Sequence, residues 1–267
     1  MMNASERNAT RKLRRVGKKL LKKSSVHKLL PLLQKLESLL SSLEQEPTEP
    51  IQESLVPSKK ALISDKLLRH TDEDVKLSVL SCITEITRIT APDAPYDDEQ
   101  MKEIFKLIAA SFEKLSHISG HEKALDILDN VDKVKLCMVM LDLECNDLAI
   151  EMFKHFLRFI RSNHPRNAIH SMESIMTLIL QESDDISPDL LRPLLDSVWN
   201  ENKALSPMSW ILGEKVIRNC AVKLKPYLMK AVESSGRALN EYADIVTDIC
   251  QNKSESVNVI FQMVLNF

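Results

Sequence analysis

Apolar residues recur at intervals of three and four along most of this chain, and that spacing restricts what it can fold into. Between Val26 and Leu43 the recurring leucines lie on one face of a helix. Similar apolar faces cover residues 71–91, 97–120, 131–145, 147–162, 167–182, 188–200, 207–222 and 238–251. Because such a face must pack against a neighbouring element, the pattern predicts a series of packed helices.

The glycine content supports the same fold class. Only four glycines occur in 267 residues, and aromatic residues make up 4% of the chain, which leaves little material for β-hairpin turns. Helices joined by short turns in pairs of roughly 40 residues are typical of an α-solenoid of the HEAT or armadillo type. The sequence therefore predicts an all-α fold and favours an α-solenoid of HEAT/armadillo-like helix pairs, with a compact irregular helical domain as the alternative.

The domain organisation is predicted from shifts in composition. Residues 1–24 form a basic arm, either disordered or an amphipathic helix, and residues 25–43 form an N-terminal helix. Residues 44–60 are expected to be a mostly exposed connector, because they contain three prolines, which cannot continue a helix: Pro47, Pro50 and Pro57. Residues 61–267 form the HEAT-like repeat domain. Its last segment, VNVIFQMVLNF, has no polar capping face, so the stack is expected to be truncated at that end.

Several helix boundaries are marked by capping residues and prolines. Thr71 and Asp74 match a capping box, which predicts a helix start, and Pro92 ends that helix at Ala91. Two Ser-Pro pairs predict further starts, with the serine as N-cap and the proline at the first helical position: Ser187-Pro188 and Ser206-Pro207. Pro193 and Pro226 predict a kink or a helix start.

Charge is divided unevenly along the chain. Residues 1–24 hold nine Lys and Arg against one acid, so the remainder has 36 − 9 = 27 basic and 38 − 1 = 37 acidic residues. The densest cluster consists of Arg11, Lys12, Arg14, Arg15, Lys18, Lys19, Lys22 and Lys23. Three interpretations remain open for it: a nuclear import signal or nucleic-acid contact, a solvated flexible arm, and a mitochondrial transit peptide.

No pattern in the sequence indicates a reaction centre, a metal site or a cofactor. The chain has no Gly-rich turn for phosphates, and His117 and His121 are separated by a helix-breaking Ser-Gly pair with no glutamate to complete a metalloprotease motif. The five cysteines are widely spaced among apolar residues, as packed thiols are, which indicates a reducing compartment. No apolar run is long enough to cross a bilayer. We therefore expect no enzyme activity and no membrane contact, and a protein that acts by binding.

One segment between two predicted helices has an unusual composition. It reads APDAPYDD and comprises Ala91, Pro92, Asp93, Ala94, Pro95, Tyr96, Asp97 and Asp98. The prolines pre-set an extended backbone, Tyr96 offers an apolar face with a polar tip, and the three carboxylates can pair with an incoming arginine. The residues alone leave two interpretations open: a connector between helices, and a peptide-docking site.

Four blocks of the sequence resemble a known family, the cohesin cofactors named for precocious dissociation of sisters. They are LLRHTDEDVKLSVLSCITEITRITAPDAPY (67–96), VDKVKLCMVMLDLECNDLAIEMFKHFLRFIR (131–161), SMESIMTLILQESDDI (171–186) and VIRNCAVKLKPYL (216–228), and they span about 55–252. The segment APDAPYDDEQMKEIFKLI is most similar to the shorter plant-type members. The basic cluster has no counterpart in the resemblance.

The resemblance implies a HEAT-repeat fold and a non-enzymatic, nuclear regulator of sister chromatid cohesion, linked in plants to repair by homologous recombination. Its implied partners are the cohesin complex and its release or protection factors. In the family the A-P-D-A-P segment is associated with docking short peptides of factors such as Wapl, which maps onto Ala91–Pro95, followed by Tyr96. Family members are generally far longer, with the HEAT repeats that grip the cohesin kleisin beyond the part represented here. A second hypothesis is a nuclear protein that contacts DNA through its basic arm.

Overall fold

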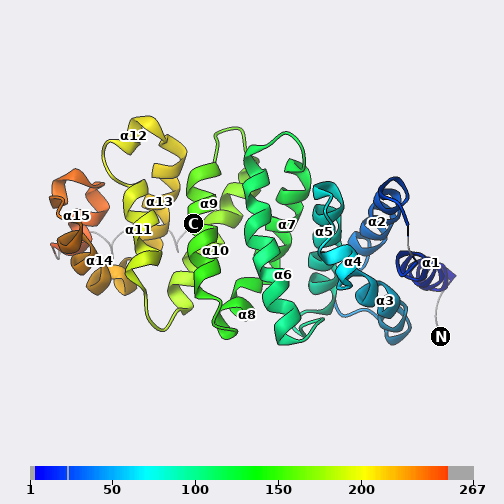
Figure 1. Cartoon of the computed structure of the whole chain (residues 1–267). Coiled ribbons are helices and arrows are strands. Elements are labelled where there is room, and N and C mark those ends of the chain that lie inside the picture. The colour runs from blue at the N-terminus through cyan, green and yellow to red at the C-terminus, as the bar shows by residue number, and fades with distance from the viewer. Residues whose placement is uncertain (1–3, 23, 252–267) are drawn as a thin grey trace. The chain divides into compact units, whose positions relative to one another are not determined.

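The computed structural model describes residues 4–22 and 24–251, and the regular secondary structure of these residues is helical (Figure 1). Their only extended pairing is an isolated bridge between Trp199 and Tyr242. The chain forms two compact units, Met1–Cys145 and Asn146–Phe267. The all-α prediction is confirmed.

The first unit contains eight α-helices within its described residues. They are α1 (Ala4–Leu20), α2 (Val26–Ser41), α3 (Glu49–Leu62), α4 (Asp65–Leu68), α5 (Glu73–Thr90), α6 (Asp98–Ser111), α7 (His121–Lys133) and α8 (Leu136–Asp142), with a 3₁₀ turn at Phe112–Ser116. Helix α1 packs on α2 and α3, α2 packs on α5, and α5 packs on α7. Each helix therefore contacts mainly helices that are near it in sequence, as in a repeat protein.

The second unit is built in the same way. Its helices are α9 (Asn146–Phe159), α10 (Arg166–Glu182), α11 (Pro188–Ser197), α12 (Asn202–Leu205), α13 (Pro207–Asn219), α14 (Ala221–Ser235) and α15 (Asp244–Cys250), with a 3₁₀ turn at Leu239–Glu241. Helix α9 packs on α10, α11 and α13, and α14 packs on α11, α13 and α15. The predicted apolar faces form the interior; for example, Phe153, Phe156 and Ile175 are fully buried.

The predicted connector at residues 44–60 is wrong, because α3 occupies most of it. Pro50 stands in the first turn of α3, where a missing N–H costs nothing, and Pro57 is accommodated inside the helix. Residues 49–62 form a helix despite these prolines because Ile51, Leu55 and Leu62 make an apolar face that is buried against α1 and α5. The predicted repeat domain at residues 61–267 is divided between the two compact units, of which the first ends at Cys145.

Other boundaries differ from the predictions by small amounts. Helix α5 is capped by Asp72, whose carboxylate accepts from the Val75 N–H at 3.0 Å, rather than by Thr71. Ser187 caps α11 as predicted. Pro207 begins α13 as predicted, although the Ser206 hydroxyl makes no capping bond. Pro193 and Pro226 lie inside α11 and α14, so neither marks a helix start.

One predicted apolar face is interrupted in the structure. The apolar face at 131–145 is divided between α7 and α8, because Lys135 adopts a left-handed conformation with φ of 52°. The segment VNVIFQMVLNF at the C-terminal end lies outside the described residues, as does Lys23.

Candidate docking corner

The APDAPYDD segment forms a turn between α5 and α6, as predicted from Pro92 and the following aspartates. We call residues 91–98 the corner. Helix α5 ends at Thr90, the Ala91 N–H bonds the Thr87 carbonyl, and the Asp93 N–H returns to the Thr90 carbonyl at 3.0 Å. The Ala91–Pro92 peptide bond is cis. The two hydrogen bonds to the Thr87 and Thr90 carbonyls hold the backbone of the corner against the last turn of α5.

The corner has an exposed half and a buried half. Pro92, Asp93 and Ala94 are exposed, whereas Pro95 is buried and Tyr96 is half-buried. The Tyr96 hydroxyl is enclosed, and burial raises the pKa of this phenol. The prediction that Tyr96 presents a polar tip to a partner is therefore wrong. The ring is the largest apolar group in the turn, and it packs inward instead.

Three charged residues lie near Tyr96: Lys59 of α3, and Asp97 and Asp98 of the corner itself. The Lys59 ammonium of α3 lies 5.8 Å from the centre of the Tyr96 ring, and partial burial lowers the pKa of this lysine. Asp97 is the N-cap of α6, and its carboxylate accepts from the Gln100 N–H at 2.9 Å. Asp98 is exposed in the first turn of α6. The exposed part of the corner is therefore acidic, because Asp93, Asp97 and Asp98 are all exposed.

The loop between α2 and α3 holds the corner from its other side. The Gln45 side-chain amide donates to the Ala91 carbonyl at 2.9 Å, and the Glu46 N–H donates to the Ile89 carbonyl at 2.9 Å. These bonds satisfy carbonyls at the C-terminal end of α5 that have no partner within the helix. They also tie the start of the corner to a segment about one repeat earlier in the chain.

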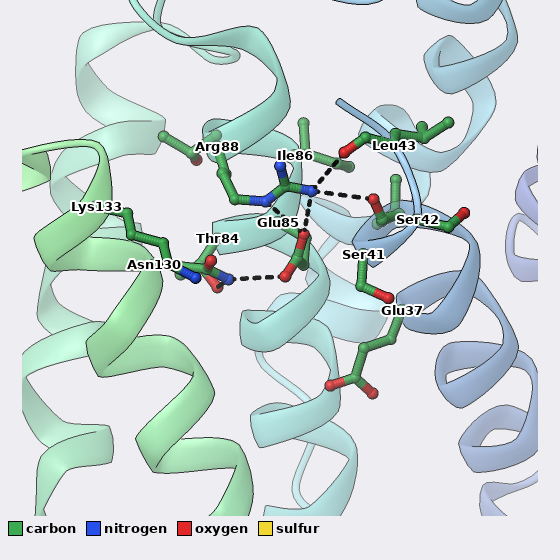
Figure 2. Close-up of polar contacts among 12 residues, drawn as sticks. Glu37, Ser41, Ser42, Leu43, Thr84, Glu85, Ile86, Arg88, Asn130 and Lys133 are labelled. Atoms are coloured by element: carbon green, nitrogen blue, oxygen red, sulfur yellow. Dashed lines mark hydrogen bonds and ion pairs between the residues drawn. The ribbon is translucent and has the colours of Figure 1, made fainter. Parts of the chain in front are cut away.

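Arg88, one turn before the corner, strengthens this connection (Figure 2). Its guanidinium donates to the carbonyls of Leu40 and Leu43, at 3.1 and 2.9 Å, and forms an ion pair with Glu85 at 2.8 Å. A cation at the C-terminal end of α2 also has the favourable sign for the helix dipole. The Glu85 carboxylate in turn accepts from the Asn130 amide of α7 at 3.0 Å. We call Arg88, Glu85 and Asn130 the polar clamp.

A second set of contacts joins the same three helices. Glu37 of α2 accepts from Ser81 of α5 at 2.5 Å and from Lys123 of α7 at 2.6 Å. Together with the polar clamp, these bonds fix α5 between its two neighbours. No local sequence pattern indicates the residues that hold the corner, because Gln45 and Ala91 are 46 positions apart.

The basic cluster belongs to a folded helix. Arg11 to Lys19 lie on α1 and Lys22 follows it, while Leu13, Val16 and Leu20 are buried against the unit. Of the three interpretations, a flexible arm does not describe residues 4–22, because α1 packs on α2 and α3. Its amphipathic character is as expected.

Other kinds of site are not found in the part of the chain that the structure describes. Residues 4–22 and 24–251 contain no group of three or more His, Cys, Asp or Glu side chains placed to hold a metal ion. No helix in these ranges is both long and apolar enough to cross a membrane.

Comparisons with known proteins identify the family. Residues 27–254 match the family model described as sister chromatid cohesion protein PDS5. The chain belongs to the PDS5 family. It is 52% identical over 231 residues to the Arabidopsis thaliana sister chromatid cohesion protein PDS5 homolog D, covering 86% of this chain and 28% of that protein. It is 49% identical to the Arabidopsis PDS5 homolog C, covering 94% of this chain and 29% of the relative.

A solved PDS5 structure confirms the fold type. The match is to a chain from the structure of the Pds5–Scc1 complex, with a TM-score of 0.67 and 26% identity, covering 79% of this chain and 33% of that one. The HEAT-type α-solenoid prediction is confirmed, and so is the resemblance. The chain spans under a third of the length of the two Arabidopsis relatives.

Proposed function

We propose that this chain is a non-enzymatic cohesin cofactor that regulates sister chromatid cohesion, and that the corner docks short peptides of cohesin release or protection factors. The observation that carries the proposal is the exposed Pro92–Ala94 segment, fixed between two helices in a chain of the PDS5 family. A rigid turn binds a peptide without first losing conformational entropy of its own.

The chemistry of the corner defines the peptide that it fits. Pro92 and Ala94 provide a small apolar surface, and the carboxylates of Asp93 and Asp98 are exposed beside it. An extended peptide carrying an arginine and an aromatic residue, such as a Wapl-type segment, matches this combination.

Calorimetric titration of a Wapl-like peptide containing Tyr and Arg tests the site. We expect Asp93→Lys to weaken binding at least tenfold, which corresponds to about 1.4 kcal/mol, because a like charge then faces the arginine. Glu182→Lys is the matched control, since Glu182 is exposed at the end of α10 in the second unit. Equal affinity for the wild-type protein and Asp93→Lys would remove the site.

The cellular setting proposed for this activity is the nucleus, with a contribution to repair by homologous recombination. Both parts rest on membership of the PDS5 family, whose relatives are named as sister chromatid cohesion proteins. Cells that lack the chain are expected to show looser sister chromatid pairing and greater sensitivity to double-strand breaks. Restoring the wild-type chain, tagged for microscopy, is expected to reverse both defects and to show nuclear signal. Exclusion of the tagged chain from the nucleus would contradict this part of the proposal.

A further inference from the structure

Helix α1 and the two residues that follow it carry eight exposed cations, and seven of them, from residue 11 onward, form a dense set. We call this set the basic face; it consists of Arg11, Lys12, Arg14, Arg15, Lys18, Lys19 and Lys22. The opposite side of the helix carries the buried Leu13, Val16 and Leu20. The Arg14 guanidinium lies 3.8 Å from the carboxylate of Glu53 on α3.

The basic face is positioned by the packing of α1. A Cβ placed on Gly17 would lie 2.7 Å from the Ser58 backbone nitrogen, so α1 and α3 approach each other at backbone distance. The Lys66 ammonium also donates to the Lys22 carbonyl just after α1. The cations are therefore presented from a fixed helix, which reduces the ordering that binding requires.

Four of these cations form a stripe along the helix. Arg11, Arg15, Lys18 and Lys22 are spaced by four, three and four residues, which places them on one side of α1. At a rise of about 1.5 Å per residue the stripe is about 16 Å long, similar to about five base-pair steps of duplex DNA. The same four side chains line an open hollow of about 570 Å³ on the helix surface.

We propose that the basic face binds the phosphate backbone of double-stranded DNA without sequence preference. Lysine and arginine clusters bind phosphates through charge and release counterions as they do so. The remainder of the chain, with 37 acidic and 27 basic residues, repels DNA and so confines the contact to this helix. This inference concerns a surface separate from the corner and does not depend on peptide docking there.

The composition of the basic face distinguishes duplex DNA from other anionic partners. Helix α1 contains no aromatic residue on which the bases of a single strand would stack. Leu13, Val16 and Leu20 are buried in the fold, so α1 has no free apolar side to insert into a membrane surface, and the exposed Leu21 just after it is a single side chain.

Fluorescence anisotropy with a labelled 20-base-pair duplex, measured on the full chain over a series of salt concentrations, tests the proposal. We expect wild-type affinity to fall steeply with salt. The variant Arg11→Gln/Arg15→Gln/Lys18→Gln/Lys22→Gln should lose at least tenfold in affinity at low salt, and its log–log salt slope should be smaller by about 3 to 4, at about 0.9 per phosphate contact. The double variant Arg15→Gln/Lys18→Gln should reduce the slope by about 2.

The control variant removes the same charge from exposed lysines outside α1: Lys35→Gln, Lys60→Gln, Lys154→Gln and Lys230→Gln. It should keep wild-type affinity and slope, and circular dichroism should show the same helical content for all variants, because glutamine is a good helix former. Three results would overturn the proposal: unchanged binding by the quadruple α1 variant, an equal loss in the control, or tighter binding of a single strand of the same length.

Discussion

Gly17 shows how one residue positions a whole helix. Its hydrogen faces α3, and a Cβ in its place would lie 2.6 Å from the Ser58 hydroxyl and 2.9 Å from the Pro57 Cβ. In an isolated helix, Gly→Ala stabilises by about 1 kcal/mol. Here the clash with backbone and buried side chains prevails, since overpacking of a closed interface costs about 1 to 3 kcal/mol.

We therefore predict that Gly17→Ala lowers the free energy of unfolding by about 1 kcal/mol net. Chemical denaturation followed by circular dichroism measures this difference. Lys12→Ala, at an exposed position of the same helix, is the control and is expected to change stability by less than about 0.5 kcal/mol. A Gly17→Ala protein as stable as wild type would show that α1 does not pack this closely on α3.

Arg88 is expected to be the most costly residue of the polar clamp to replace. The Arg88 side chain is 19% exposed and that of Glu85 is 13% exposed. Removing the guanidinium therefore leaves the largely buried Glu85 carboxylate without its cation, and the carbonyls of Leu40 and Leu43 without this donor. We predict that Arg88→Met lowers the free energy of unfolding by about 2 kcal/mol. Arg218→Met, which breaks the more exposed pair with Glu214, should cost less than about 0.5 kcal/mol. Equal losses for the two variants would contradict this ranking.

The buried thiol of Cys137 makes the free energy of unfolding depend on pH in the alkaline range. Burial raises the pKa of this thiol from 9.0 to about 11. Between these values the unfolded chain releases the proton while the folded chain retains it, so the stability contributed below pH 9 is lost as pH rises towards 11. We predict that Cys137→Ala flattens this decline, by about 2 kcal/mol between pH 8 and 11. Parallel stability curves for the variant and wild type would contradict the prediction.

At the scale of single elements, the N-cap of α5 provides a direct comparison between sequence pattern and structure. The capping box indicates Thr71, whereas the bond to the Val75 N–H comes from Asp72. We predict that Asp72→Ala costs about 1 kcal/mol and that Thr71→Ala is close to neutral. Thermal unfolding of the two variants measures both losses of stability. A larger loss for Thr71→Ala than for Asp72→Ala would show that Thr71 is the N-cap of α5, as the capping box indicates.

The helical class and most apolar faces could be predicted because a period of three to four residues is local information. Helix α3 could not be predicted, because the three prolines in residues 44–60 indicated a connector. Its apolar face packs on α1 and α5, and these partners are known only from the fold. The corner was located from Pro92 and the aspartates that follow it. Its supports, Gln45 and Arg88, were missed because their bonds join residues 45 to 48 positions apart.

At the scale of the whole molecule, the basic face and the corner are separate surfaces that can be changed independently. Deleting residues 1–24 is a poor test of the basic face, because it removes α1 and uncovers the apolar side of α3. Substitutions that change charge and keep the buried leucines leave the helix in place. Asp93→Lys therefore tests the corner, and the quadruple α1 variant tests the basic face, each in the complete chain.

The central claim, that this chain is a cohesin cofactor acting by binding, is tested most directly by affinity capture from nuclear extract. The bait is the full chain, compared with Asp93→Lys and with the quadruple α1 variant, after nuclease treatment to remove bridging DNA. We predict that wild type and the α1 variant recover cohesin subunits with a release or protection factor, and that Asp93→Lys recovers less of that factor. Recovery of cohesin subunits by wild type no greater than by an empty matrix would contradict the claim.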